Sequence, residues 1–100
     1  MLNNLLLQLN TVIEFDEQKR IQTLEERSLD FARADEIFAD AVADIEDVRR
    51  AYGERRFKTY GFLDGRLTAV VWTVRGTKRR IISMRKANER EIKKYTQRVG

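Results

Sequence analysis

The stretch Asp64-Gly65-Arg66-Leu67-Thr68-Ala69-Val70-Val71-Trp72-Thr73-Val74-Arg75-Gly76 decides the fold of this chain. Asp-Gly is the strongest signal in the sequence for a tight turn between two antiparallel strands. The run from Leu67 to Val74 is apolar on both faces, which is typical of a strand in the middle of a sheet. Arg75-Gly76 marks the next turn. We therefore predict a central strand joined by tight turns to one strand before it and one after it.

Two better-defined strands flank this one and two weaker ones precede them. Residues 55–63 are rich in aromatic side chains and end at the Asp-Gly turn, and residues 78–85 follow the second turn and centre on Ile81-Ile82. Weaker patterns predict strands over residues 11–15 and 42–47. Strands that are joined by tight turns pair antiparallel, so the sheet is expected to be mainly antiparallel.

Three segments predict helices, each with a capping residue at its start. Asp16 and Asp30 are placed to cap helices over residues 17–27 and 31–39, and Asn88 with Glu91 forms a capping box that opens a C-terminal helix. Helical spacing predicts that the following side chains face inward: Ile21, Leu24, Phe31, Ala34, Ile37, Phe38, Ala41, Ile92, Tyr95 and Val99. Two N-terminal helices, one C-terminal helix and a compact sheet predict an α+β fold.

Composition limits the chemistry that this protein can perform. A chain of 100 residues is expected to form one domain, which we place over residues 11–100 with residues 1–10 as an N-terminal extension. Histidine and cysteine are absent, which excludes zinc-finger ligands, a thiol nucleophile and a Ser-His-Asp triad. The acidic stretch over residues 35–47 matches no calcium-loop spacing, so we predict neither a metal nor a cofactor. No apolar run approaches the roughly 20 residues of a membrane span, and we expect a cytoplasmic protein.

The charge is divided unequally along the chain. Residues 1–54 hold 6 basic and 13 acidic residues, a net charge of −7, whereas residues 55–100 hold 14 basic and 3 acidic residues, a net charge of +11. A basic half of this kind suits a phosphate backbone, while the acidic half repels one. The alternative is that both halves contribute to one mixed, solvated surface.

The strand over residues 78–85 and its surroundings carry most of the candidate ligands for an anion. Alternation predicts Arg79, Ile81, Ser83 and Arg85 on one face and Arg80, Ile82 and Met84 on the other. Guanidinium groups stay charged and bind phosphate with two hydrogen bonds, so this strand is a candidate cradle for RNA. The alternative is an edge strand whose charges serve only solubility. The candidate residues are Arg75, Lys78, Arg79, Arg80, Arg85 and Lys86.

Glu54 precedes the strand over residues 55–63 and is the best-placed candidate for a general base. It is also placed to pair with Arg56 or Arg75, and a surface ion pair of that kind is the simpler interpretation.

Taken together, these segments resemble the BrnT-type toxins of bacterial type II toxin–antitoxin modules. The likeness covers about residues 13–96, and its most specific part is Arg80-Ile81-Ile82-Ser83-Met84-Arg85-Lys86-Ala87 after Arg75-Gly76. Other matching residues are Phe15-Asp16, Lys19, Leu29-Asp30-Phe31, Phe38, Tyr52-Gly53-Glu54-Arg55-Arg56-Phe57, Gly61, Asp64-Gly65-Arg66-Leu67, Val70-Val71-Trp72-Thr73, Glu91 and Tyr95.

The resemblance implies a RelE-like fold and a metal-independent endoribonuclease that inhibits translation. It also implies a cognate ribbon-helix-helix antitoxin. The toxin–antitoxin pair would contact operator DNA only through this antitoxin. By this likeness Arg56, Arg75, Arg80, Arg85 and Lys86 belong to the active or RNA-binding face. We assign Arg56, Arg75, Arg80, Arg85 and Glu54 to catalysis, and Lys78, Arg79, Lys86 and Arg27 to RNA binding.

The chain departs from the family pattern at two places. Family members usually carry Lys-His-Gly after the first helix, where this chain has Glu26-Arg27-Ser28, and Glu17 stands where a proline is usual. An arginine and lysine site for phosphate can work without imidazole. The alternative function is a non-cleaving, degenerate toxin that binds the antitoxin and acts as a transcriptional co-repressor.

Overall fold

The structure is a computed structural model and describes residues 12–48, 51 and 53–97. The predicted extension over residues 1–10 lies outside the described residues. In chain order the elements are β1 (Ile13–Glu14), α2 (Glu17–Arg27), the 3₁₀-helix η1 (Phe31–Arg33), α3 (Ala34–Ala39), β2 (Ala41–Asp47), β3 (Arg56–Leu63), β4 (Arg66–Arg75), β5 (Lys78–Lys86) and α4 (Glu89–Thr96). This order confirms the α+β fold that the sequence predicts.

The described strands form one five-stranded sheet in the order β1-β5-β4-β3-β2. As predicted, β4 is central, and it is joined to β3 through Asp64 and Gly65, both with positive φ, as a tight hairpin turn requires. The pairings β2–β3, β3–β4 and β4–β5 are antiparallel, whereas β1 pairs parallel with β5. The sheet is therefore mixed, with β1 and β2 at its two edges.

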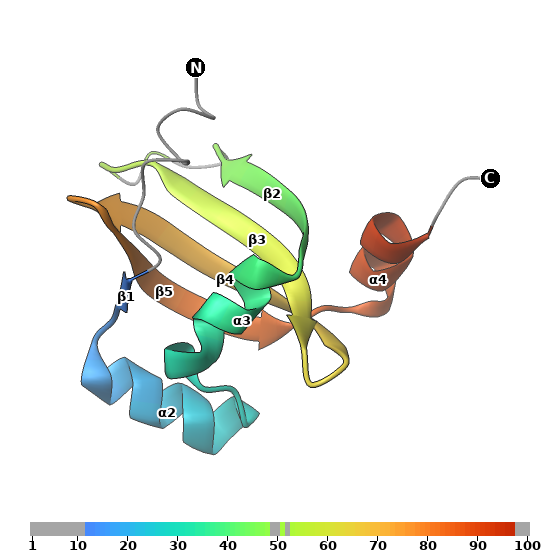
Figure 1. The fold of residues 1–100 in the computed structure, drawn as a ribbon, viewed down its shortest axis with the longest axis horizontal. Helices are drawn as coiled ribbons and strands as arrows, with labels where there is room; N and C mark the ends of the chain where they lie inside the picture. The colour runs from blue at the N-terminus through green and yellow to red at the C-terminus, as the bar shows by residue number, and fades with distance from the viewer. Residues whose placement is uncertain (1–11, 49–50, 52, 98–100) are drawn as a thin grey trace.

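Helices pack on both sides of the sheet, but not in equal measure (Figure 1). The larger core cluster lies on one face, where Phe31, Ile37, Phe57, Trp72 and Met84 are buried together beneath η1 and α3. A smaller cluster lies at one end of the opposite face, under Ile92 and Tyr95 of α4; its buried members are Tyr60, Leu67, Ala69 and Ala87. We call the first face the helix-covered face and the second the open face.

The predicted caps are confirmed. The side chain of Asp16 accepts a hydrogen bond from the Gln18 amide at 2.9 Å, and the side chain of Asp30 accepts one from the Ala32 amide at 2.9 Å. Asn88 and Glu91 form the complete capping box of α4. The prediction that Ile21 and Leu24 face the core is wrong: their exposures are 46% and 40%. It is also wrong for Ala41, which is exposed because it begins β2 instead of continuing the helix. Val99 lies outside the described residues. The segment α2 packs against η1 and β5, so it has no broad surface on which to bury an apolar stripe.

A register shift in β5 overturns the predicted alternation of its side chains. Trp72 pairs with Ile81, but Val71 pairs with Ser83, so Ile82 is the extra residue of a β-bulge. Ile81 and Met84 consequently both enter the core of the helix-covered face. Arg79 stays on that face, while Arg85 is turned to the open face together with Arg80.

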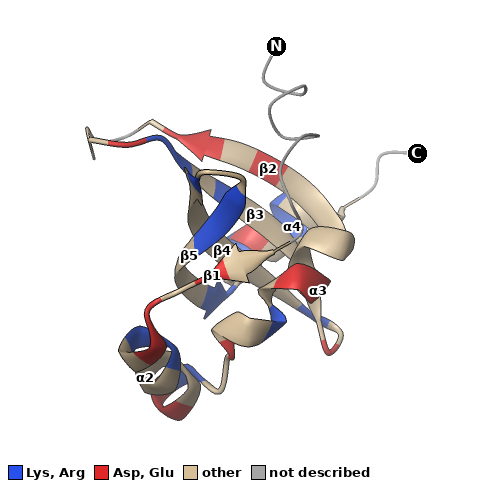
Figure 2. Cartoon of the chain, turned by 60° about the vertical axis from the view of Figure 1, so that its left-hand side comes forward, with Lys and Arg blue, Asp and Glu red and all other residues tan. Residues whose placement is uncertain are grey.

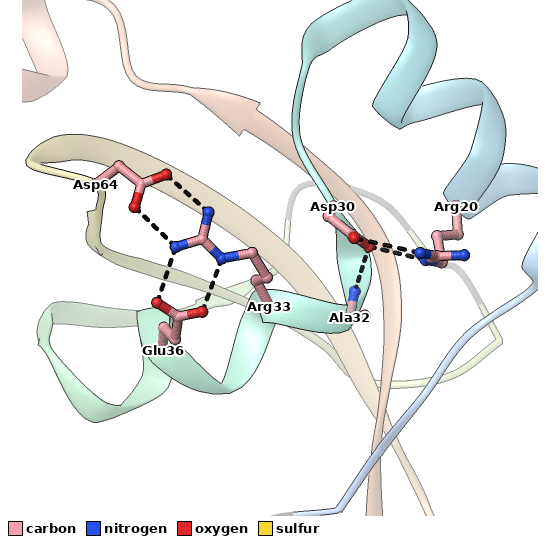
Figure 3. Close-up of polar contacts among 6 residues, drawn as sticks. All are labelled: Arg20, Asp30, Ala32, Arg33, Glu36 and Asp64. Carbon is pink, nitrogen blue, oxygen red and sulfur yellow. Dashed lines mark hydrogen bonds and ion pairs between the residues drawn. The ribbon is translucent and has the colours of Figure 1, made fainter.

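Ion pairs bind the N-terminal segments to each other and to the sheet (Figure 3). Arg33 donates to Glu36 at 2.7 and 3.0 Å and to Asp64 at 2.7 Å through two nitrogens, which ties η1 to the β3–β4 turn. Arg20 of α2 donates to Asp30 at 2.8 Å. These contacts hold the pKa of Asp30 and of Asp64 below their usual values. Both arginines are thus already engaged with carboxylates.

Candidate functional site

One row of side chains crosses the open face from β1 to β3. Glu14 lies opposite Arg80, Arg80 opposite Thr73, and Thr73 opposite Arg56. Adjacent strands are roughly 4.8 Å apart, so Arg80 and Arg56 are separated by roughly 10 Å of backbone with the small Thr73 between them. We call Glu14, Arg80, Thr73 and Arg56 the cross-sheet row. Two guanidinium groups that flank a short side chain can approach one phosphate from two sides.

Arg75 and Glu54 extend this row toward the turn between β4 and β5. The Glu54 carboxylate lies 3.5 Å from Nη2 of Arg75 and 3.5 Å from Nε of Arg56. This geometry confirms that Glu54 pairs with both arginines that the sequence offered as partners. Lys78 pairs in register with Arg75 and is exposed at the same end. In Figure 2 basic residues colour much of β5, whereas acidic residues colour β2.

Arg75 and Arg80 of the open face are held less closely by their carboxylates than Arg20 and Arg33 are on the opposite side of the sheet. On the helix-covered side, Arg20 and Arg33 contact carboxylates at 2.7–2.8 Å with several hydrogen bonds each. On the open face, the contacts of Arg75 with Glu54 and of Arg80 with Glu14 are 3.5 Å long. The side chains of Arg75 and Arg80 are 53% and 33% exposed. A guanidinium that is held at a long distance from its carboxylate and partly exposed retains donors for an incoming anion.

Arg85 lies on the open face but serves a different contact. It donates to both oxygens of Glu91 at 2.7 Å, and the Tyr60 hydroxyl donates to the same carboxylate. The pair with Arg85 holds the pKa of Glu91 far below its usual value, and burial with the bond to Glu91 raises the pKa of Tyr60. Stacking of Tyr60 on Tyr95, with ring centroids 4.3 Å apart, completes the cluster. Arg85, Glu91 and Tyr60 therefore anchor α4 to the sheet.

Two of the residues assigned to RNA binding lie away from the cross-sheet row. The guanidinium of Arg79 is packed 4.3 Å from the ring centre of Phe38 and 5.0 Å from that of Trp72, on the helix-covered face. Burial there lowers the pKa of Arg79. Lys86 pairs in register with Thr68 and lines a hollow beside α2. The RNA contacts of Arg79 and Lys86 stay predictions.

Arg27, at the position where the resembling family usually has histidine, also lies away from the row. It is the last residue of α2 and donates to the backbone carbonyl of Met84 at 2.8 Å. Ser28 follows in the left-handed conformation, with φ of 58°, and donates its amide to the Leu24 carbonyl. This is the helix C-terminal position that favours glycine, which agrees with the glycine that the resemblance implies for this segment. The changed segment therefore terminates a helix.

Sequence reasoning missed Glu14. Its signal is present, because Glu14 stands between two apolar residues, Ile13 and Phe15, that pack against the core. Alternation then turns Glu14 to the opposite face. The sequence does not show that β1 pairs parallel with β5. This pairing places Glu14 beside Arg80, which is 66 residues away in the chain.

Among the described residues, no three acidic side chains come together as ligands for a metal ion. None of the helices in the described part of the chain is long and apolar enough to cross a membrane. The fold and the surface define a small α+β protein whose sheet carries arginines on its open face.

Residues 15–91 match the family described as the ribonuclease toxin, BrnT, of type II toxin–antitoxin systems. The match covers well over half of the 100 residues, so the chain belongs to the BrnT family, as the resemblance indicated. The family is one of ribonuclease toxins, and membership implies an RNA substrate and an antitoxin partner. Comparison with curated proteins finds no match.

Proposed function

We propose that this chain is a metal-independent endoribonuclease toxin that cleaves RNA on the open face of its sheet and thereby inhibits translation. The observation that carries the proposal is the cross-sheet row, in which Arg80 and Arg56 flank Thr73 with Arg75 nearby. Arg20, Arg33 and Arg85 contact carboxylates at 2.7–2.8 Å, whereas Arg75 and Arg80 contact theirs at 3.5 Å. An RNA phosphate is the anion that family membership favours here.

The chemistry that suits these residues is attack of the RNA 2′-hydroxyl on the adjacent phosphate. The pentacoordinate transition state carries extra negative charge on the phosphate oxygens. Fixed guanidinium groups that face this charge stabilise it without reorganising, which is usually the largest catalytic contribution. We assign this role to Arg56, Arg75 and Arg80. Because arginines supply the positive charge, the proposed reaction needs no metal ion.

The remaining assigned residues support this site from its margins. Glu54 contacts both Arg56 and Arg75, so it positions these two arginines. Lys78 is exposed beside Arg75 and is suited to a neighbouring phosphate of the same strand. Arg85 remains a candidate for a more distant phosphate, because its contact with Glu91 leaves its side chain 39% exposed.

We further propose that a ribbon-helix-helix antitoxin neutralises this toxin in the cytoplasm and carries the pair to operator DNA. The alternative of a non-cleaving, degenerate toxin rests on the changed segment Glu26-Arg27-Ser28. That segment ends α2 on the other side of the sheet from Arg80, which favours a cleaving enzyme over the alternative.

The test is cleavage of a labelled RNA by the purified chain and by Arg80→Ala. Loss of one transition-state donor is expected to lower kcat/KM by about 100-fold or more. Arg66→Ala is the matched control, because Arg66 is exposed and lines the hollow beside α2. Chelation with EDTA is expected to leave the rate unchanged. Equal cleavage by all three proteins would remove the row from the mechanism, and an inactive wild type would support the non-cleaving alternative.

A further inference from the structure

The side chain of Glu14 is fixed on the open face by its neighbours in the sequence. Ile13 and Phe15 both pack against the core of the helix-covered face, and Phe15 meets the edge of the Phe31 ring with centroids 6.1 Å apart. Because alternate residues of a strand point to opposite faces, Glu14 is directed to the face that carries Arg80. The amide of Arg79 donates to the Val12 carbonyl at 3.2 Å, which holds β1 in this register.

The carboxylates of the open face differ in what they already bind. Glu91 accepts two bonds from Arg85 and one each from Tyr60 and the Asn88 amide, so its oxygens are fully used. Glu54 lies between two arginines at 3.5 Å. Asp47 lies opposite Arg56 at the far edge of the sheet. Glu14 contacts Arg80 at 3.5 Å and keeps a third of its side chain exposed.

We propose that Glu14 is the general base that accepts the proton of the attacking 2′-hydroxyl, an assignment that rests on the function proposed above. A phosphate bound by the outer nitrogens of Arg80 brings its own ribose toward the carboxylate that contacts the same guanidinium. A general base must lie within about 3 Å of the group whose proton it removes, and a carboxylate 3.5 Å from the phosphate-binding arginine is placed to reach that group. Glu54 then acts as a positioning residue for Arg56 and Arg75.

The step balances without any added reagent. The 2′-oxygen forms a bond to phosphorus while its proton passes to an oxygen of Glu14. The bond from phosphorus to the 5′-oxygen breaks, and the leaving oxygen takes a proton from water. The hydroxide that remains takes the proton from Glu14, which restores the carboxylate. The products are a 2′,3′-cyclic phosphate and a 5′-hydroxyl end.

The test compares wild type with Glu14→Gln, which keeps the size of the side chain and removes its basic oxygen. We expect kcat to fall by about 100-fold or more, the usual contribution of a general base, with KM within about threefold of the wild type. The acidic limb of the kcat–pH profile is expected to disappear. Binding of a 2′-O-methyl RNA, which cannot be cleaved, is expected to stay equal or become tighter because a negative charge is lost. Glu25→Gln, on the exposed side of α2, is the matched control and should match wild type.

Each other outcome overturns the assignment in a distinct way. Full activity of Glu14→Gln beside an inactive Arg80→Ala would leave the ribonuclease function and remove Glu14 as its base. A kcat loss in Asp47→Asn, with Glu14→Gln fully active, would assign the proton to Asp47 instead. Weaker binding of 2′-O-methyl RNA by Glu14→Gln would show that Glu14 only positions Arg80. An inactive wild type would overturn both the proposed function and this assignment.

Discussion

Replacement of Glu91 by glutamine tests how strongly α4 is held to the sheet. Glu91 accepts two hydrogen bonds from Arg85 at 2.7 Å, one from the Tyr60 hydroxyl, and one from the Asn88 amide at 3.0 Å. Its side chain is 14% exposed, and that of Arg85 is 39% exposed. Glutamine keeps one acceptor oxygen but replaces the other with a donor that faces the guanidinium.

The expected cost follows from these contacts. A hydrogen bond to a charged group contributes about 1.5–3 kcal/mol, against about 1 kcal/mol for a neutral bond. Two bonds to Arg85 are weakened or lost, and we reduce the total because Arg85 is partly solvated. Glu91→Gln is therefore expected to lower the free energy of unfolding by about 2 kcal/mol at pH 7, or Tm by about 10 °C for a domain of this size.

The effect of pH on this difference has a definite sign. The pKa of Glu91 is lowered in the folded protein from its usual value of 4.5. A lowered pKa gives stability that is fully present above the unfolded pKa and is lost as pH falls through the folded value. The difference between wild type and Glu91→Gln is thus expected to stay constant from pH 8 to about pH 5.5 and to shrink below about pH 4.5.

Urea denaturation followed by the fluorescence of the single tryptophan, Trp72, measures this difference at each pH, because Trp72 is buried at 2% exposure. Glu89→Gln is the control, since Glu89 lies on the same helix and is exposed. A difference below about 0.5 kcal/mol at pH 7, the size of an ordinary surface change, would refute the reasoning. So would a difference that grows as the solution is acidified.

Two further predictions concern the backbone. Gly61→Ala is expected to lower the free energy of unfolding by about 3 kcal/mol in urea denaturation. The reason is overpacking, because a Cβ at this position would lie 2.3 Å from the Ile37 carbonyl oxygen. A decrease of less than about 1 kcal/mol would show that α3 moves aside. Ser28→Gly is expected to stabilise the fold by about 1 kcal/mol in the same assay, since Ser28 has a φ of 58° and glycine relieves the left-handed strain. Gly53→Ala, with φ of 76° and no atom within 4 Å of the new Cβ, is a control for conformational strain alone.

Most of the elements of the fold were predictable because their signals are local. The Asp64-Gly65 turn and the caps at Asp16, Asp30 and Asn88 depend on residues close together in the chain, and each appears where it was expected. The position of α2 was not predictable in this way. Its spacing of Ile21 and Leu24 is amphipathic, but whether such a stripe is covered depends on which surface the helix meets.

The candidate site was predictable in composition and less so in geometry. Arg56, Arg75, Arg80, Arg85 and Glu54 all reach the open face, whereas Arg79 packs against Phe38 and Trp72. Arginine is equally suited to phosphate and to an aromatic ring, so residue type alone does not separate these uses. Glu14 was missed because β1 has only two residues and pairs parallel with β5, so no tight turn in the sequence indicates which strand it pairs with.

The bulge at Ile82 decides both the position of α4 and the charge of the open face. Without it, strict alternation would set Arg85 on the same face as Arg79, beneath the helices, and Met84 on the same face as Arg80. Glu91 would then lose its partner and the core would lose Met84, which is completely buried. The inserted residue exchanges the faces to which Arg85 and Met84 point, and it leaves Arg80 opposite Thr73. One extra residue in β5 therefore places the anchor of α4 and the cross-sheet row on the same face, opposite the larger core cluster.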